Sequence, residues 1–113
     1  EAAEQLTRLR SQDKEYVSDS FGCISAYGPN AALPHYSATS EQQSEIHPKG
    51  LYLVDSGAQY THGTTDITRT MPLGELTELE KEDYTLVLKG MIDLSMLYFP
   101  KGSKGCNIDI VAR

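Results

Sequence analysis

Two neighbouring stretches of sequence decide the fold of this chain: LYLVDSGA at residues 51–58 and YTHGTTDITRTM at residues 60–71. The first begins with four apolar residues in succession, a pattern typical of a strand that is covered on both faces. The second is rich in threonine, isoleucine and tyrosine, which are enriched in strands. We therefore predict that the two stretches form a long antiparallel pair of strands, bent at the glycines that interrupt them.

Each predicted strand carries one aspartate, Asp55 in the first and Asp66 in the second. Aspartate is depleted from strands, and a buried carboxylate without a partner is costly. If the strands pair, both carboxylates can point into the same space, where each opposes the ionisation of the other. A divalent cation between them removes that conflict, and hard oxygen ligands suit Mn²⁺, Mg²⁺ or, in mixed sites, Zn²⁺. The pattern leaves open a second interpretation, in which both aspartates only cap turns at strand ends.

The remaining elements are predicted from local signals. We expect a helix over residues 2–10, short strands over 21–26 and 31–36, a polar surface loop over 37–50, a long helix over 76–98 and the start of a new helix over 107–113. Thr77 and Glu80 form a capping box at the start of the long helix, and Pro100 ends it. Gly90 within that helix allows a close backbone approach.

One face of the long helix is apolar at helical spacing, and we predict that it faces a core. Its residues are Tyr84, Val87, Leu88, Met91, Leu94, Ser95 and Tyr98.

The three histidines need separate treatment, because a lone histidine is usually structural or solvated. His35 lies between Pro34 and Tyr36, which indicates a partly buried ring. His47 lies in the polar loop and is expected to be solvated. His62 is expected to serve the turn between the two strands, although it could approach the aspartates. The run KGSKG at residues 101–105 lacks the residue order of a phosphate-binding loop, so we reject that interpretation.

The bulk composition is that of a soluble globular domain, with 113 residues, 39% hydrophobic and 23% charged. The net charge is −6 and no cluster of lysine and arginine occurs, which argues against nucleic-acid binding. No apolar run is long enough to span a membrane. Cys23 and Cys106 are far apart and are expected to be reduced thiols of a cytoplasmic protein. Because the chain starts at Glu1 and stops at Arg113 within a predicted helix, we expect a piece of a longer protein.

Several stretches of the chain, taken together and in order, resemble the aminopeptidase P family of Xaa-Pro aminopeptidases, in peptidase family M24. They are Gly28-Pro29-Asn30 through His35-Tyr36, residues 53–60, residues 63–70, residues 84–90, and Phe99-Pro100 with the glycines after it. The combination of Asp-Ser-Gly with Gly-Thr-Thr-Asp-Ile-Thr-Arg-Thr is the most specific part, and nearly the whole chain takes part in the resemblance.

This resemblance implies an α+β architecture: residues 1–113 would be the N-terminal half of a pita-bread catalytic domain, a curved antiparallel sheet with a long covering helix. It also implies two divalent metal ions, Mn²⁺ or alternatively Zn²⁺ or Co²⁺, held by two aspartates, a histidine and two glutamates. Asp55 matches the ligand of one metal, and Asp66 matches the ligand that bridges both. His35 matches a histidine that binds substrate and assists proton transfer, and Thr68 is placed to orient a carboxylate.

The family's histidine ligand and two glutamate ligands are not matched in this sequence. The acidic residues near the start of the long helix, Glu75, Glu78, Glu80 and Glu82, are explained by the helix dipole. We therefore expect the 113-residue chain alone to be inactive. The complete enzyme would hydrolyse the N-terminal Xaa-Pro bond of a peptide substrate with a metal-activated water, as a homodimer in the cytoplasm.

Three alternatives remain at this stage. A prolidase-like dipeptidase would share the fold and the metals. A creatinase-like enzyme would use the fold without metals, which the paired aspartates argue against. A non-catalytic pita-bread module, used for binding, could have kept the two aspartates by descent.

Overall fold

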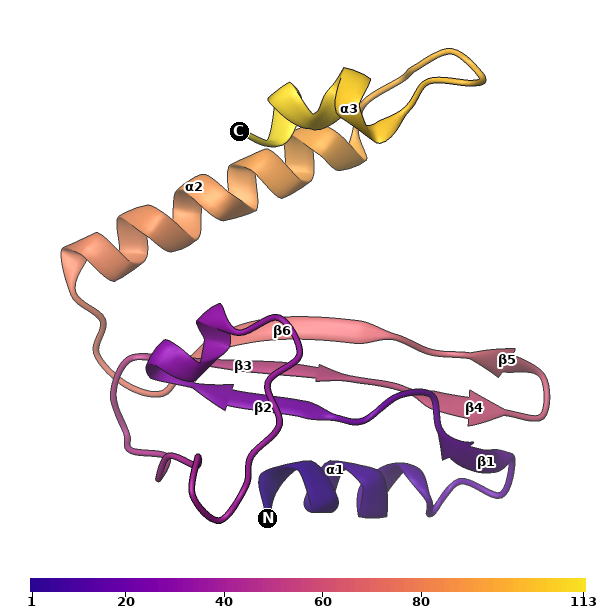
Figure 1. Cartoon of the computed structure of the whole chain (residues 1–113), viewed down its shortest axis with the longest axis vertical. Coiled ribbons are helices and arrows are strands. Elements are labelled where there is room, and N and C mark those ends of the chain that lie inside the picture. Colours follow the sequence, from indigo (N-terminus) through magenta and orange to yellow (C-terminus); the bar gives the residue numbers. More distant parts are fainter. The chain divides into compact units, whose positions relative to one another are not determined.

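The computed structural model describes residues 1–113, which form two compact units, 1–75 and 76–113. The first unit contains six strands (Figure 1), which are β1 (Tyr16–Asp19), β2 (Ile24–Tyr27), β3 (Leu51–Ser56), β4 (Ala58–Tyr60), β5 (Gly63–Thr64) and β6 (Ile67–Pro72). They pair in two antiparallel sheets with the orders β1-β4-β5 and β2-β3-β6. No helix of the chain is both long enough and apolar enough to cross a membrane.

The predicted long antiparallel pair is confirmed. β3 pairs with β6 from Leu51 opposite Pro72 to Ser56 opposite Ile67, and β4 pairs with β5 beyond them. The pair is interrupted at Gly57 on one side and between β5 and β6 on the other. The two sheets therefore share one hairpin, and the interruption lies beside both aspartates.

Gly57 is required at this interruption, because a Cβ there would overlap the carbonyl oxygen of Thr65. Ser20 joins the two segments: its hydroxyl donates to that oxygen at 2.8 Å, and its backbone N–H donates to the Gly57 carbonyl at 3.1 Å. Thr65 is held further by its own N–H, which donates to the Ala58 carbonyl at 2.8 Å. We call Ser20, Gly57 and Thr65 the strand junction.

The prediction that β3 is covered on both faces holds for only one of them. Tyr52, Val54 and Ser56 are buried, whereas Leu51, Leu53 and Asp55 are partly exposed. Strand side chains alternate between the faces, so these sets belong to opposite sides of the sheet. Ile24 and Ala26 of β2 lie on the less covered face, opposite Asp55 and Leu53, and form a small core there with Tyr36. Ala31 and Leu53 are partly buried at the edge of this core.

The predicted strand over residues 31–36 is wrong. Residues Gly28–Ala32 form a 3-10 helix, η1, and a turn follows it. Gly28 has a φ of 54°, a left-handed conformation that glycine adopts readily, and Pro29 suits the first turn of a helix. These two residues start a helical turn before the apolar run can extend. The strand predicted over 21–26 begins at Ile24, and the loop over 37–50 is confirmed.

The helices are placed close to their predictions. In the first unit α1 spans Ala2–Arg10, as expected. In the second, α2 spans Glu78–Ser95, α3 spans Gly105–Ile108, and a 3-10 helix, η2, spans Asp109–Ala112. α2 therefore ends before Pro100, and the last helical segment starts two residues earlier than predicted.

The predicted capping box of α2 is confirmed. The Thr77 hydroxyl accepts the Glu80 N–H at 3.2 Å, and the Glu80 carboxylate accepts the Thr77 N–H at 2.8 Å. The backbone hydrogen bond from Thr77 is the main reason that the pKa of Glu80 lies below its ordinary value. The close approach predicted at Gly90 is also present, since a Cβ there would lie 2.8 Å from the Ala112 carbonyl oxygen.

The apolar stripe of α2 is exposed in this chain, with exposed fractions of 74% for Val87 and 52% for Met91. Within the second unit the main partner of α2 is η2. The core-facing role of this stripe, and with it the covering role predicted for the helix, is therefore not confirmed.

A Gly57→Ala substitution should lower the free energy of unfolding by about 1–3 kcal/mol, because the added carbon must displace the Thr65 carbonyl or the Ser20 hydroxyl. Urea denaturation followed by circular dichroism measures this loss. Gly63→Ala in the same hairpin is the matched control: its Cβ position is open, so stability should be unchanged or higher by up to about 1 kcal/mol. Equal losses in the two variants would contradict the role of the junction.

Candidate metal centre

The structure brings three of the four predicted site residues together around one cavity of about 620 Å³ in the first unit, and the fourth, Thr68, does not line it. Asp55, Asp66 and His35 line it. Cys23 and Phe21, which were not predicted as site residues, line it too.

Asp55 is positioned by the strand ladder. It lies opposite Ile24 of β2 on one side and opposite Thr68 of β6 on the other. Side chains directly opposite one another project from the same face, with Cβ atoms about 5 Å apart. Thr68 is thus a direct cross-strand neighbour of Asp55.

One oxygen of Asp55 shows the fit to a cation most directly. Oδ1 is buried and has no hydrogen-bond partner in the chain. Buried polar atoms are nearly always paired, because an unpaired one loses its hydration without compensation. A divalent cation is a natural partner for a carboxylate oxygen in this position.

Asp66 is positioned by the strand junction. It follows Thr65, whose carbonyl and N–H are both hydrogen-bonded, and precedes Ile67, which pairs with Ser56. The Asp66 side chain is exposed. Its backbone is therefore held on both sides, while its carboxylate is free to turn towards a ligand.

His35 reaches the cavity from the turn after η1, where it is exposed. The other two histidines lie elsewhere, as predicted. His47 is exposed in the polar loop and stacks edge-on against Tyr27, with ring centroids 6.3 Å apart. His62 lies in the exposed turn between β4 and β5.

The side chains present fit a hard cation but do not enclose one. No three of the histidine, cysteine, aspartate and glutamate side chains converge closely enough to hold a metal ion together. Asp55 and Asp66 could supply carboxylate oxygens, and any further ligands would have to come from elsewhere.

Cys23 is one of the cavity residues that the sequence analysis missed, because its place depends on strand register. It directly precedes Ile24, which pairs with Asp55, and this pairing brings the thiol to the cavity. The thiol is free and partly buried. Burial raises its pKa above the ordinary value; Asp19 and Asp55 add to the rise, and Arg10 opposes it.

The chain is similar to known proteins over its whole length. Residues 1–113 match the sequence profile of metallopeptidase family M24. The chain is 52% identical over 113 residues to a protein of Paracoccidioides brasiliensis (strain Pb03) named probable Xaa-Pro aminopeptidase P, covering all of this chain and 18% of that protein. It is 54% identical over 112 residues to a protein of the same name from Botryotinia fuckeliana, covering 99% of this chain and 17% of that one.

Solved structures show the same likeness. The X-prolyl aminopeptidase of Caenorhabditis elegans, described as a cytosolic enzyme with a di-nuclear active site, is 40% identical, with a TM-score of 0.88 over 98% of this chain and 18% of its own. The prolidase of Pyrococcus furiosus is 30% identical, with a TM-score of 0.81 over 97% of this chain and 31% of its own.

The chain therefore belongs to metallopeptidase family M24, and its antiparallel sheets are part of the pita-bread fold of that family. Within the family, the resemblance to aminopeptidase P is confirmed by relatives of that name. The chain spans less than a fifth of the length of these curated relatives.

The two thiols should differ in reactivity. Alkylation by iodoacetamide at pH 8 should be slower at Cys23 than at the exposed Cys106, because burial limits access to Cys23 and its raised pKa lowers the thiolate fraction at a given pH. Peptide mapping by mass spectrometry at successive times gives both rates. In urea the difference should vanish; faster labelling of Cys23 in the folded chain would contradict its placement beside the cavity.

Proposed function

We propose that this chain is part of a metal-dependent aminopeptidase that hydrolyses the peptide bond between an N-terminal residue and proline. The observation that carries the proposal is the convergence of Asp55, Asp66 and His35 on one cavity, with an unpaired buried oxygen on Asp55. The names of the relatives point to the same substrate class.

Asp55 and Asp66 would hold two divalent ions, with Asp55 on one ion and Asp66 bridging both. The description of the Caenorhabditis elegans enzyme as di-nuclear supports two ions, and oxygen ligands favour Mn²⁺, with Zn²⁺ or Co²⁺ as alternatives. When bound, such ions acidify a water molecule and polarise a carbonyl group. A histidine and two glutamates from outside these 113 residues would complete the ligands.

The other residues of the chain have separate tasks in this proposal. Thr68 lies opposite Asp55, where its hydroxyl can orient the carboxylate. His35 lies at the cavity wall without being one of the ligands, where it can bind substrate and transfer a proton to the leaving proline nitrogen.

We also propose that the full-length protein is a cytoplasmic homodimer. The cytosolic description of the Caenorhabditis elegans enzyme supports the compartment, and the dimer rests on the family resemblance. Cell fractionation and sedimentation velocity test these two statements; a membrane-bound or monomeric full-length protein would contradict them.

The full-length gene product should cleave an Xaa-Pro-Xaa tripeptide only after loading with a divalent metal ion, with Mn²⁺ expected to serve and Zn²⁺ and Co²⁺ as the alternatives. Asp55→Asn and Asp66→Asn should each lower kcat/KM by at least about 100-fold and lower the bound metal, because loss of even an outer partner of a metal ligand costs about 10- to 100-fold. His35→Ala should lower kcat by about 100-fold or more with metal content unchanged, since general acid–base groups contribute about that much. Liquid chromatography of the products and elemental analysis give both readouts.

Asp93→Asn is the charge-matched control, because Asp93 is exposed on α2 and does not line the cavity of Asp55 and Asp66. It should leave both activity and metal content unchanged. Cleavage of Xaa-Pro dipeptides alone would favour the prolidase alternative. A full-length protein that binds no metal and cleaves neither substrate would favour the non-catalytic module.

The isolated 113-residue chain should be inactive on the same tripeptide with Mn²⁺ present. Two carboxylates cannot hold two ions in a fixed geometry, and no group of three suitable side chains exists in the chain. Liquid chromatography of the two expected products, the free N-terminal residue and the Pro-Xaa dipeptide, at high protein concentration tests this. Metal-dependent cleavage by the chain, retained by Asp93→Asn and lost in Asp55→Asn, would show that the ligand shell is complete without further residues.

A further inference from the structure

The turn that carries His35 is held by the tyrosine next to it. Tyr36 is buried, with an exposed fraction of 7%, and packs in the core with Ile24 and Ala26. His35 itself is exposed. Because an exposed side chain has little packing of its own, the place of the His35 imidazole depends on the backbone that Tyr36 anchors.

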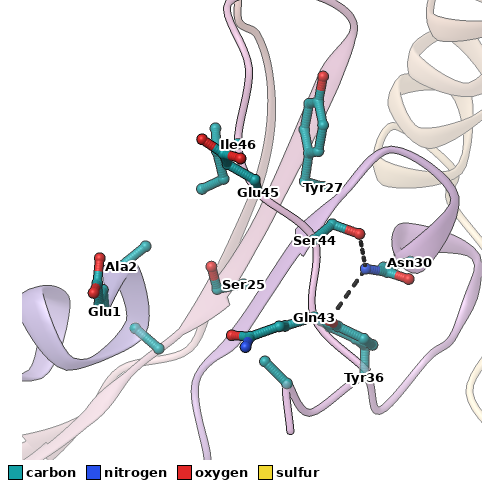
Figure 2. Close-up of a pocket in the computed structure, with 12 residues that line it drawn as sticks. Glu1, Ala2, Ser25, Tyr27, Asn30, Tyr36, Gln43, Ser44, Glu45 and Ile46 are labelled. Atoms are coloured by element: carbon teal, nitrogen blue, oxygen red, sulfur yellow. Dashed lines mark hydrogen bonds between the residues drawn. The ribbon is translucent and has the colours of Figure 1, made fainter. Parts of the chain in front are cut away.

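The Tyr36 hydroxyl lies at the centre of a hydrogen-bond network, part of which is drawn in Figure 2. It donates to the Gln42 carbonyl oxygen at 2.9 Å and accepts from the Asn30 side-chain amide at 3.1 Å. The same amide nitrogen donates to the Ser44 hydroxyl at 3.0 Å. The hydroxyl thus joins η1, which precedes His35, to the polar loop that follows it.

The backbone of the turn depends on the same residues. The Leu33 N–H donates to the Asn30 carbonyl at 3.1 Å, and the Tyr36 N–H donates to the Leu33 carbonyl at 3.1 Å. Asn30 therefore holds the turn twice, through its carbonyl and through its side chain. Pro34 and His35 lie between Leu33 and Tyr36, which the second of the two backbone bonds joins. The position of both residues therefore depends on the position of Tyr36.

The Tyr36 hydroxyl acts away from the reacting groups. Tyr36 lines the cavity of Asp55 and Asp66, but also a second cavity of the first unit. Two residues of its hydroxyl network, Asn30 and Ser44, line the second cavity and not the cavity of Asp55 and Asp66 (Figure 2). A direct role of this hydroxyl on a substrate beside Asp55 does not fit that arrangement, whereas a role through His35 does.

We infer that Tyr36 is a positioning residue for His35: its hydroxyl, bonded to Asn30 and Gln42, holds the turn so that the imidazole stays at the cavity of Asp55 and Asp66. This inference rests on the proposed function, in which His35 transfers a proton. Proton transfer requires hydrogen-bond reach, so a small displacement of the turn is costly to the rate.

The test is a double-mutant cycle on the metal-loaded full-length gene product with an Xaa-Pro-Xaa tripeptide. Tyr36→Phe should lower kcat about tenfold, with KM changed less than about twofold, because misplacement by about 1 Å can cost up to about 100-fold. Bound metal should be unchanged. In a His35→Ala background the same substitution should lower kcat by less than about twofold, since a residue that acts through His35 has nothing left to position.

Tyr27→Phe is the matched control. It removes a comparable hydroxyl bond in the same unit, from Tyr27 to the Lys49 carbonyl at 3.0 Å, which does not involve the His35 turn. It should leave kcat within about twofold of wild type, as expected for an ordinary hydrogen bond away from the site. The inference is overturned if Tyr27→Phe lowers kcat as much as Tyr36→Phe does. It is also overturned if Tyr36→Phe lowers kcat by the same factor in the wild-type and the His35→Ala backgrounds.

Hydrogen exchange separates this inference from the proposed function, because it needs no activity. Tyr36→Phe should speed amide exchange of the peptide containing residues 33–36 about tenfold, the effect of losing about one hydrogen bond, and Tyr27→Phe should not. If the wild-type protein is active and Tyr36→Phe changes neither the amide exchange nor kcat, only the positioning role is overturned. If the wild-type protein is inactive but amide exchange is faster in Tyr36→Phe, the proposed function is overturned and the anchoring of the turn by Tyr36 is supported.

Discussion

The position of both aspartates depends on one close backbone contact, between Gly57 and the carbonyl oxygen of Thr65. Only glycine allows the two segments of the hairpin to approach this closely, and Ser20 bonds to both of them. Asp55 lies two residues before the contact, and Asp66 lies one residue after it. The backbone positions from which the two carboxylates project are therefore set by backbone packing, before any cation or substrate contributes.

His35 comes to the same cavity by a less rigid route. Asp55 lies within a three-stranded ladder, whereas His35 lies on a turn and is exposed. Groups on strands are held more accurately than groups on loops, so a working histidine on a turn needs support of its own. The buried ring and bonded hydroxyl of Tyr36 supply it. This also gives a physical reason for the order Gly28-Pro29-Asn30, in which glycine and proline start η1 and asparagine ties it to Tyr36.

The hairpin and its two aspartates could be predicted from the sequence, because strand pairing follows from local composition and puts both carboxylates near one another. Other features depend on partners that local patterns do not specify. The conformation of residues 31–36 was mispredicted because Gly28 and Pro29 override the apolar run. Cys23 reaches the cavity only through the register of β2 against β3, which no local signal gives. The residues of the predicted stripe from Tyr84 to Ser95 lie on α2, whereas Tyr98 lies beyond its end, and periodicity does not say what covers a helical face.

In the proposed enzyme the strand ladder contributes to metal affinity as well as to geometry. Oδ1 of Asp55 is buried without a partner in the chain, and leaving a buried acceptor unpaired costs about 1–3 kcal/mol. A bound cation removes that cost. The site would therefore bind the cation about 5- to 150-fold more tightly than a site whose carboxylate is fully hydrated before the cation binds. The rest of the ligand shell could then be weaker for the same occupancy. Substitutions that loosen the pairing of β3 with β2 or β6 would let water reach Oδ1 and would reduce this gain, even where Asp55 itself is unchanged.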